Sequence, residues 1–237
     1  MNKKLLLILP ALMMSLTMMA ELKPLRVLIL GDDPMMVSDE SIGSVGYATA
    51  LQSAFDDAVK VRIETSASLL PSDPAALLEP ARKGDVVLLC KLPVEMDTED
   101  RTKADIYLDQ LLPIQQAAQK KGVKIIWLTQ ACPRYFTAEG QQVHRLGNLP
   151  EVVRRMCQRD ELPIIDLEQL MFNWITEAGA EASAAAFVPV TPPSPAAAEK
   201  AAREGYNLTE AGAQQVGQLI IEAIRADKRN ILSKRLR

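Results

Sequence analysis

Short apolar runs alternate with longer amphipathic stretches along most of this chain, and this alternation limits the fold more than any other feature. Five runs have the length and residue types of strands: Leu25–Leu30, Val59–Ile63, Val86–Cys90, Val123–Thr129 and Ile164–Leu167. Helical spacing marks Tyr47–Phe55, Pro74–Arg82, Thr102–Lys121, Leu149–Arg159, Glu168–Ala178 and Thr209–Ala226. Because such long connections join parallel strands, we expect a three-layer α/β/α domain with a central parallel sheet of about five strands.

The N-terminus has the pattern of an export signal. Lys3 and Lys4 precede an uncharged apolar run from Leu5 to Ala20, and Glu21 follows. Such a short apolar run with a positive start is typical of a cleaved signal peptide, and an uncleaved anchor is the alternative. We therefore expect 1–20 to be removed, the protein to be periplasmic or secreted, and 21–237 to form one domain without a membrane span.

The charge balance narrows the range of partners. The chain has 27 Lys and Arg against 30 Asp and Glu, a formal charge of −3, and loss of Lys3 and Lys4 leaves −5. This acidic balance argues against nucleic acid and against an anionic membrane surface as partners. The segment 180–202 is rich in Ala and Pro and is predicted to be an insertion or loop within the domain.

Cysteine and histidine are scarce, which restricts the available chemistry. The spacing of Cys90, Cys132 and Cys157 matches no zinc site, and a Cys132–Cys157 disulfide is one option after export. His144 is the only histidine, so any mechanism that requires an imidazole base must use it. We expect no cofactor and no bound metal.

The loop after the first predicted strand carries the most informative motif, Gly31-Asp32-Asp33. A strand that ends in Gly-Asp-Ser presents the nucleophile in SGNH (GDSL-type) hydrolases, and the chain resembles the rhamnogalacturonan acetylesterase branch of that superfamily. Further blocks in the same order carry the resemblance: Gly46–Ala48 with Leu51, Lys83–Leu89, Lys121–Thr129, Leu162–Leu167 and Asn207–Ala213. The resemblance implies an SGNH hydrolase fold over nearly the whole of 21–237.

The same resemblance places unsuitable residues at the family's catalytic positions. Asp33 stands in place of the nucleophilic Ser, and Asn207 in place of the His base, with Glu204 in place of its Asp partner. Ser68 and Val94 stand in place of the oxyanion-hole Gly and Asn. Ester hydrolysis by this route needs an activated hydroxyl and preorganised donors for the oxyanion, and loss of one donor alone costs roughly 100-fold in rate.

Two alternatives use other side chains of the same loops. His144 is an alternative base for a hydroxyl nucleophile supplied by Ser38, Ser41 or Ser44. Alternatively, carboxylates could hold Ca²⁺ or Mg²⁺, and the candidates are Asp32, Asp33, Asp39 and Glu40. In most proteins, acids in such a loop are solvated and a histidine in such a loop lies on the surface without a catalytic role.

The sequence therefore favours an exported relative of carbohydrate acetylesterases that has lost catalysis and retains a cleft for a glycan or a partner protein. The catalytic alternative is a serine-type carboxylic ester hydrolase, a carbohydrate O-acetylesterase with a relocated site at His144. A third hypothesis is a structural or interaction protein of the cell envelope.

Overall fold

A five-stranded parallel sheet forms the centre of the domain, as the sequence predicts. The computed structural model describes residues 23–65, 74–93 and 101–237. The strands follow the order β2-β1-β3-β4-β6. Their bounds are β1 Leu25–Gly31, β2 Val59–Thr65, β3 Val86–Cys90, β4 Lys124–Leu128 and β6 Ile164–Ile165. Every neighbouring pair is parallel, so all five carboxyl ends lie at one edge of the sheet.

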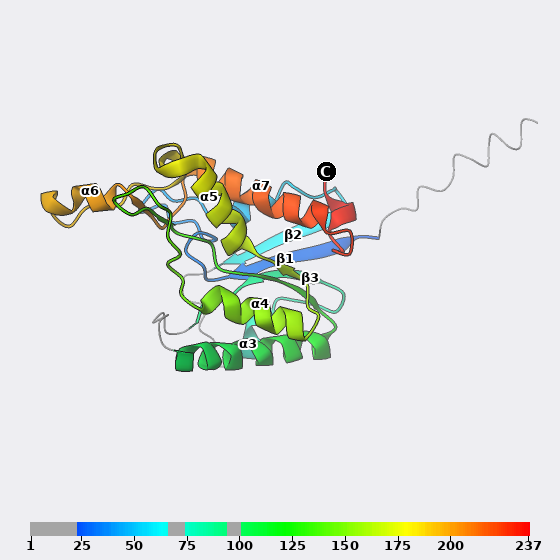
Figure 1. The fold of residues 1–237 in the computed structure, drawn as a ribbon. Helices are drawn as coiled ribbons and strands as arrows, with labels where there is room; N and C mark the ends of the chain where they lie inside the picture. Colours follow the sequence, from blue (N-terminus) through cyan, green and yellow to red (C-terminus); the bar gives the residue numbers. More distant parts are fainter. Residues whose placement is uncertain (1–22, 66–73, 94–100) are drawn as a thin grey trace, which may run out of the picture.

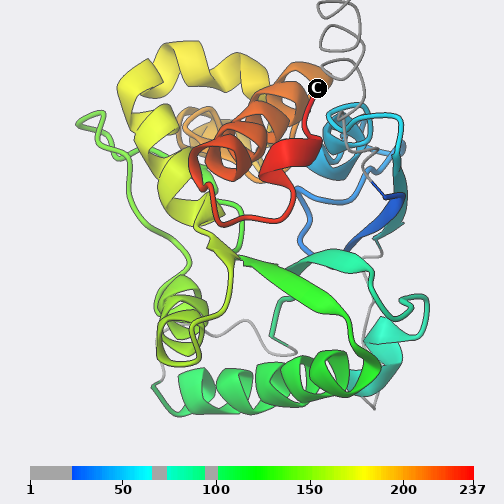
Figure 2. The same cartoon turned by 90° about the vertical axis from the view of Figure 1, so that its right-hand side faces the viewer.

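Helices cover both faces of the sheet, which confirms the three-layer architecture (Figures 1 and 2). One face carries α2 Tyr47–Leu51, α5 Leu167–Ser183 and α7 Glu210–Ala226, and the other carries α3 Arg101–Lys121 and α4 Leu149–Arg159. Alternate residues of β1 enter two separate hydrophobic cores, Val27 and Ile29 on the α7 side, Leu28 and Leu30 on the α3 side. This double burial explains why the strand is apolar throughout.

Smaller elements differ from the sequence-based expectation. The stretch expected to be a helix from Pro74 is a 3-10 helix, Pro74–Leu78. α5 extends to Ser183 across a kink at Gly179, whose φ of 77° favours glycine. The predicted insertion contains short helical turns at Ala184–Ala186 and Pro195–Ala197 and the helix α6, Ala198–Ala201. The short strands β5 Arg134–Tyr135 and β7 Glu204–Gly205 pair in an antiparallel ribbon that was not predicted.

The start of α7 is fixed in the predicted way. Thr209 is the N-cap residue, and its side chain accepts a hydrogen bond from the Gly212 backbone N–H at 3.2 Å. A Cβ on Gly212 would lie 1.9 Å from the Ala186 carbonyl oxygen, so only glycine permits this close approach. The cap and the contact hold Asn207 and Leu208 at the carboxyl edge of the sheet.

The three cysteines are free and buried. Cys132 belongs to the core on the α7 face and Cys157 to the core on the α3 face. Because the sheet separates the two thiols, the optional Cys132–Cys157 disulfide is not formed.

Three sequence-based expectations fall on residues outside the described ranges, namely the signal segment 1–20 and the positions Ser68 and Val94. Among the residues that the structure does describe, no helix has the length and hydropathy needed to cross a bilayer.

Candidate functional site

The carboxyl edge of the sheet gathers the residues singled out by the sequence. Asp32 and Asp33 follow β1, Lys91 follows β3, and Gln130 follows β4. The chain leaves β1 toward one side of the sheet, to β2, and leaves β3 toward the other side, to β4. In open α/β sheets, ligands bind in the crevice outside the carboxyl ends of two such strands. The candidate site is therefore expected at this edge.

Asp33, which the resemblance assigns to the nucleophile position, is turned into the protein. Asp33 is 2% exposed, and its Oδ1 accepts a hydrogen bond from the Met35 N–H at 2.8 Å. Its Oδ2 accepts one from the Ala131 N–H at 2.9 Å, with the Cys90 thiol 3.7 Å away. The carboxyl group thus joins the ends of β1, β3 and β4. Burial raises the pKa of Asp33 to about 6, although the backbone donors of Ala131 and Met35 oppose the shift.

Asp32 is engaged in a second buried network. It pairs with Lys91 and accepts a hydrogen bond from the Leu92 N–H at 2.7 Å. The Tyr107 hydroxyl donates to the Lys91 carbonyl oxygen at 2.5 Å and accepts from the Gln130 side chain at 2.6 Å. Burial raises the pKa of Asp32, and the hydrogen bond from Lys91 opposes this. Both carboxyl groups are thus taken up by internal donors.

The carboxylates proposed as metal ligands do not gather around a common point. Asp39 accepts hydrogen bonds from the backbone and hydroxyl of Ser41, at 2.9 Å and 2.6 Å. In the described part of the chain, no group of three or more His, Cys, Asp or Glu side chains could hold a metal ion.

Glu204 and Asn207, which the resemblance assigns to the positions of the family's acid and base, have other partners than Asp33. Glu204 is in β7, with its carboxylate 3.7 Å from the Lys200 Nζ. The Asn207 carbonyl oxygen accepts a hydrogen bond from the Val188 N–H at 2.8 Å. Across the described ranges, no hydrogen bond or ion pair joins Asp33 to Glu204 or to Asn207.

A cavity of about 240 Å³ lies beside Glu204, under the Ala- and Pro-rich segment. Phe187, Pro192 and Arg134 line it. Arg134 is buried, and its guanidinium donates to the Ala180 and Ala202 carbonyl oxygens at 2.5 Å and 3.0 Å. This buried cation fixes the cavity wall against α5. The cavity therefore offers an apolar wall, an aromatic ring and the Glu204 carboxylate to a small ligand.

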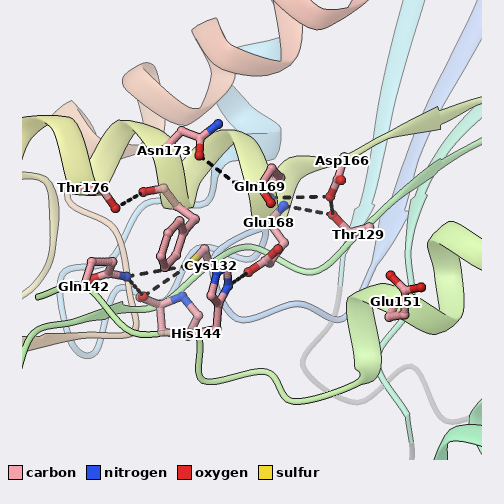
Figure 3. Close-up of polar contacts among 12 residues, drawn as sticks. Thr129, Cys132, Gln142, His144, Glu151, Asp166, Glu168, Gln169, Asn173 and Thr176 are labelled. Carbon is pink, nitrogen blue, oxygen red and sulfur yellow. Dashed lines mark hydrogen bonds and ion pairs between the residues drawn. The ribbon is translucent and has the colours of Figure 1, made fainter.

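His144 is held in one orientation by α5 (Figure 3). Its Nδ1 lies 2.5 Å from the Glu168 Oε1, and its ring stacks on Phe172 at a centroid distance of 3.7 Å and an angle of 7°. The imidazole side chain is 53% exposed, whereas Glu168 is buried. A carboxylate that fixes Nδ1 and leaves Nε2 accessible is the arrangement of a general base and its orienting acid.

The sequence reasoning missed the partners of this histidine. The Arg154 Nη2 lies 2.5 Å from the Glu168 Oε2, and the same guanidinium binds both oxygens of Asp166 at 2.8 Å and 2.9 Å. Hydrogen bonds from Arg154 to Asp166 raise the pKa of the guanidinium. The end of the strand at Ile165 was the available signal, because Asp166 and Glu168 follow it at the carboxyl edge.

The candidate nucleophiles for His144 are engaged elsewhere. The Ser38 hydroxyl accepts from the Gly46 N–H at 2.9 Å, and the Ser44 hydroxyl accepts from the Asp39 N–H at 3.1 Å. Ser41 donates to Asp39. Within the described residues, the polar partner of the imidazole is Glu168, and no serine hydroxyl is hydrogen-bonded to it.

The chain is similar to known proteins over most of its length. No protein-family model matches the chain. It is 24% identical over 216 residues to rhamnogalacturonan acetylesterase RhgT of Bacillus subtilis, a match that covers 85% of this chain and 90% of that protein. The crystal structure of the protein YXIM of Bacillus subtilis superposes with a TM-score of 0.65 at 15% identity. That match covers 89% of this chain and spans only 58% of the other, so it supports the fold alone.

Proposed function

We propose, starting from the membership of this chain in the SGNH (GDSL-type) hydrolase superfamily, that it is an exported member that binds an acetylated carbohydrate without hydrolysing it. The observation that carries the proposal is the state of Asp33. The resemblance assigns this residue to the nucleophile position, and its carboxyl group is buried and accepts backbone hydrogen bonds at both oxygens. It braces three strand ends and is not available to a substrate.

The chemistry of the replaced residues supports the loss of hydrolysis. A carboxylate that attacked an acetyl ester would give a mixed anhydride, whereas the family's serine gives an acyl-enzyme ester. Asn207 cannot accept the proton of a nucleophile at neutral pH. Asp33 therefore cannot replace the serine nucleophile, and Asn207 cannot replace the histidine base.

The carbohydrate part of the proposal rests on the named activity of the curated relative and on the cavity at Glu204. The relative is a rhamnogalacturonan acetylesterase. The Glu204 carboxylate can accept hydrogen bonds from sugar hydroxyls, and Phe187 and Pro192 offer apolar surface to a sugar face or an acetyl methyl group.

Titration calorimetry with acetylated rhamnogalacturonan oligosaccharides tests the proposal. We expect saturable binding, with no acetate released during the titration. Glu204→Gln should weaken binding about tenfold, since hydrogen bonds to charged groups contribute about 1.5–3 kcal/mol. The matched control Arg155→Gln, an exposed change on α4, should bind as the wild type does. Absence of binding, or equal loss in both variants, would contradict the carbohydrate proposal.

A second candidate function is hydrolysis with His144 as the base, and the His144–Glu168 pair is the observation that favours it. This function would need a nucleophile, a water or a serine, at the free Nε2. It predicts that His144→Gln abolishes turnover while leaving the affinity for acetylated oligosaccharides unchanged.

A further inference from the structure

The edge of the sheet opposite the candidate site carries many cations. Some of them pair with acids of the same edge: Arg229 with Asp227, Arg235 with Asp56 and Arg237 with Asp57. The last thirteen residues, Arg225 to Arg237, contain six Lys or Arg and one acid, Asp227. Backbone hydrogen bonds from Arg237 N–H to the Ala54 carbonyl oxygen at 2.9 Å, and from Asp56 N–H to the Arg235 carbonyl oxygen at 2.7 Å, fix this segment next to the start of β2. Figure 1 shows the C-terminus at the end of the sheet where β1 begins.

Other cations join this segment because of the topology. Helix α3 ends with Lys120 and Lys121, and Lys124 begins β4, so all three lie at the amino edge of the sheet. Cations at the ends of helices complement the helix dipole, which accounts for part of the pattern. It does not account for Lys228 and Lys234, which lie beyond the end of α7 and, within the described ranges, form no ion pair.

An open groove of about 910 Å³ crosses the same edge. Lys124, Arg229 and Ile231 line it, together with the acids Glu161 and Asp227. Ile231 is 42% exposed, one of the few large apolar side chains that the structure leaves in solvent. An exposed isoleucine among cations suits the boundary between lipid headgroups and acyl chains, where it can insert while the cations meet phosphates.

The start of the first strand lies at the same edge, because the Arg235 guanidinium donates to the Lys23 carbonyl oxygen at 2.6 Å. The net charge of −5 predicted for 21–237 does not describe this edge. At physiological salt the field of an exposed charge is screened within about 8 Å, so adsorption depends on the charges close to the contacting surface.

We propose that the basic edge, defined by Lys228, Arg229, Ile231 and Lys234 with Lys124, docks on an anionic phospholipid bilayer. In this orientation the carboxyl edge with Asp33, Glu204 and His144 faces away from the lipid. A soluble polyanion would satisfy the cations but would leave Ile231 without a partner, so the observations favour lipid. The inference does not depend on whether the site hydrolyses its ligand.

Vesicle sedimentation of the chain from Glu21 onward tests this docking. That chain contains both hydrophobic cores and all the described strands, and a cooperative thermal transition verifies its fold before use. We expect partition into vesicles that contain phosphatidylglycerol, a decrease with salt, and no partition into phosphatidylcholine alone. The variant Lys228→Gln/Arg229→Gln/Lys234→Gln should partition roughly 100-fold more weakly, at roughly fivefold per cation.

The matched control is Arg62→Gln/Arg155→Gln/Lys200→Gln, which removes the same charge from exposed cations elsewhere on the domain. It should partition within about twofold of the wild type. Equal partition into both lipids, equal loss in the two triple variants, or binding to soluble polygalacturonate without binding to vesicles would each overturn the proposal.

Discussion

Asp33→Asn should gain stability relative to the wild type by about 2.4 kcal/mol as the pH rises from 4 to 7. Burial raises the pKa of this carboxyl group from its ordinary value of 3.8 to about 6. Between these two values the folded protein binds more protons than the unfolded chain, so the Asp33 contribution is fully present below 3.8 and is lost as the pH passes 6. Asn does not titrate, and this loss is absent from the variant.

Chemical denaturation of both proteins across this pH range measures the difference directly. At pH 4 the variant should be the less stable, because an amide cannot accept hydrogen bonds from Met35 and Ala131 at both of its atoms. Asp160→Asn is the control, since that exposed carboxylate pairs with Arg159, which lowers its pKa. A difference between wild type and Asp33→Asn that stays constant from pH 4 to pH 7 would contradict the buried position of the carboxyl group.

Arg154→Met should lower the free energy of unfolding by about 2–3 kcal/mol. The change retains the apolar stem of the side chain but leaves the buried Glu168 carboxylate with His144 as its remaining side-chain partner. It also removes both hydrogen bonds to Asp166, the residue that caps α5. For a domain of this size we expect the melting temperature to fall by about 4–12 °C.

The neighbouring residue provides a matched control. Arg155 is exposed and pairs with Glu151 at 2.7 Å across one helical turn, so Arg155→Met should change stability by no more than about 0.5 kcal/mol. Glu168→Gln in the Arg154→Met background should recover part of the loss, because it removes the orphaned charge. Equal melting temperatures for Arg154→Met and Arg155→Met would refute this role of the cluster.

The fold could be predicted from the sequence because local pattern and tertiary burial agree in the long elements. The helix Leu149–Arg159 was predicted to the residue, and the Thr209 cap of α7 was predicted from its position before an apolar stripe. The ribbon of β5 and β7 was not predicted, since two-residue strands far apart in the chain carry no periodicity. The length of α5 was underestimated because the kink at Gly179 interrupts the helical pattern.

The site could be predicted only in part. The resemblance singled out Asp33, Glu204 and Asn207, but no pattern in the sequence reveals that the Asp33 carboxyl group points inward to the Ala131 N–H. The pairing of His144 with Glu168 joins a loop residue to the first turn of α5, 24 residues away, and it depends on the register of β4 against β6. Net charge is a sum over the whole chain, so it could not reveal that cations gather at the amino edge of the sheet.

Release of acetate from aryl acetates and acetylated sugars measures whether the protein hydrolyses esters at all. We expect the wild type, Asp33→Asn and His144→Gln all to give the rate of buffer alone, even at high protein concentration and with each protein shown to be folded. Saturable turnover by the wild type that disappears in Asp33→Asn or in His144→Gln would contradict the account, and the variant that loses activity would identify the catalytic group.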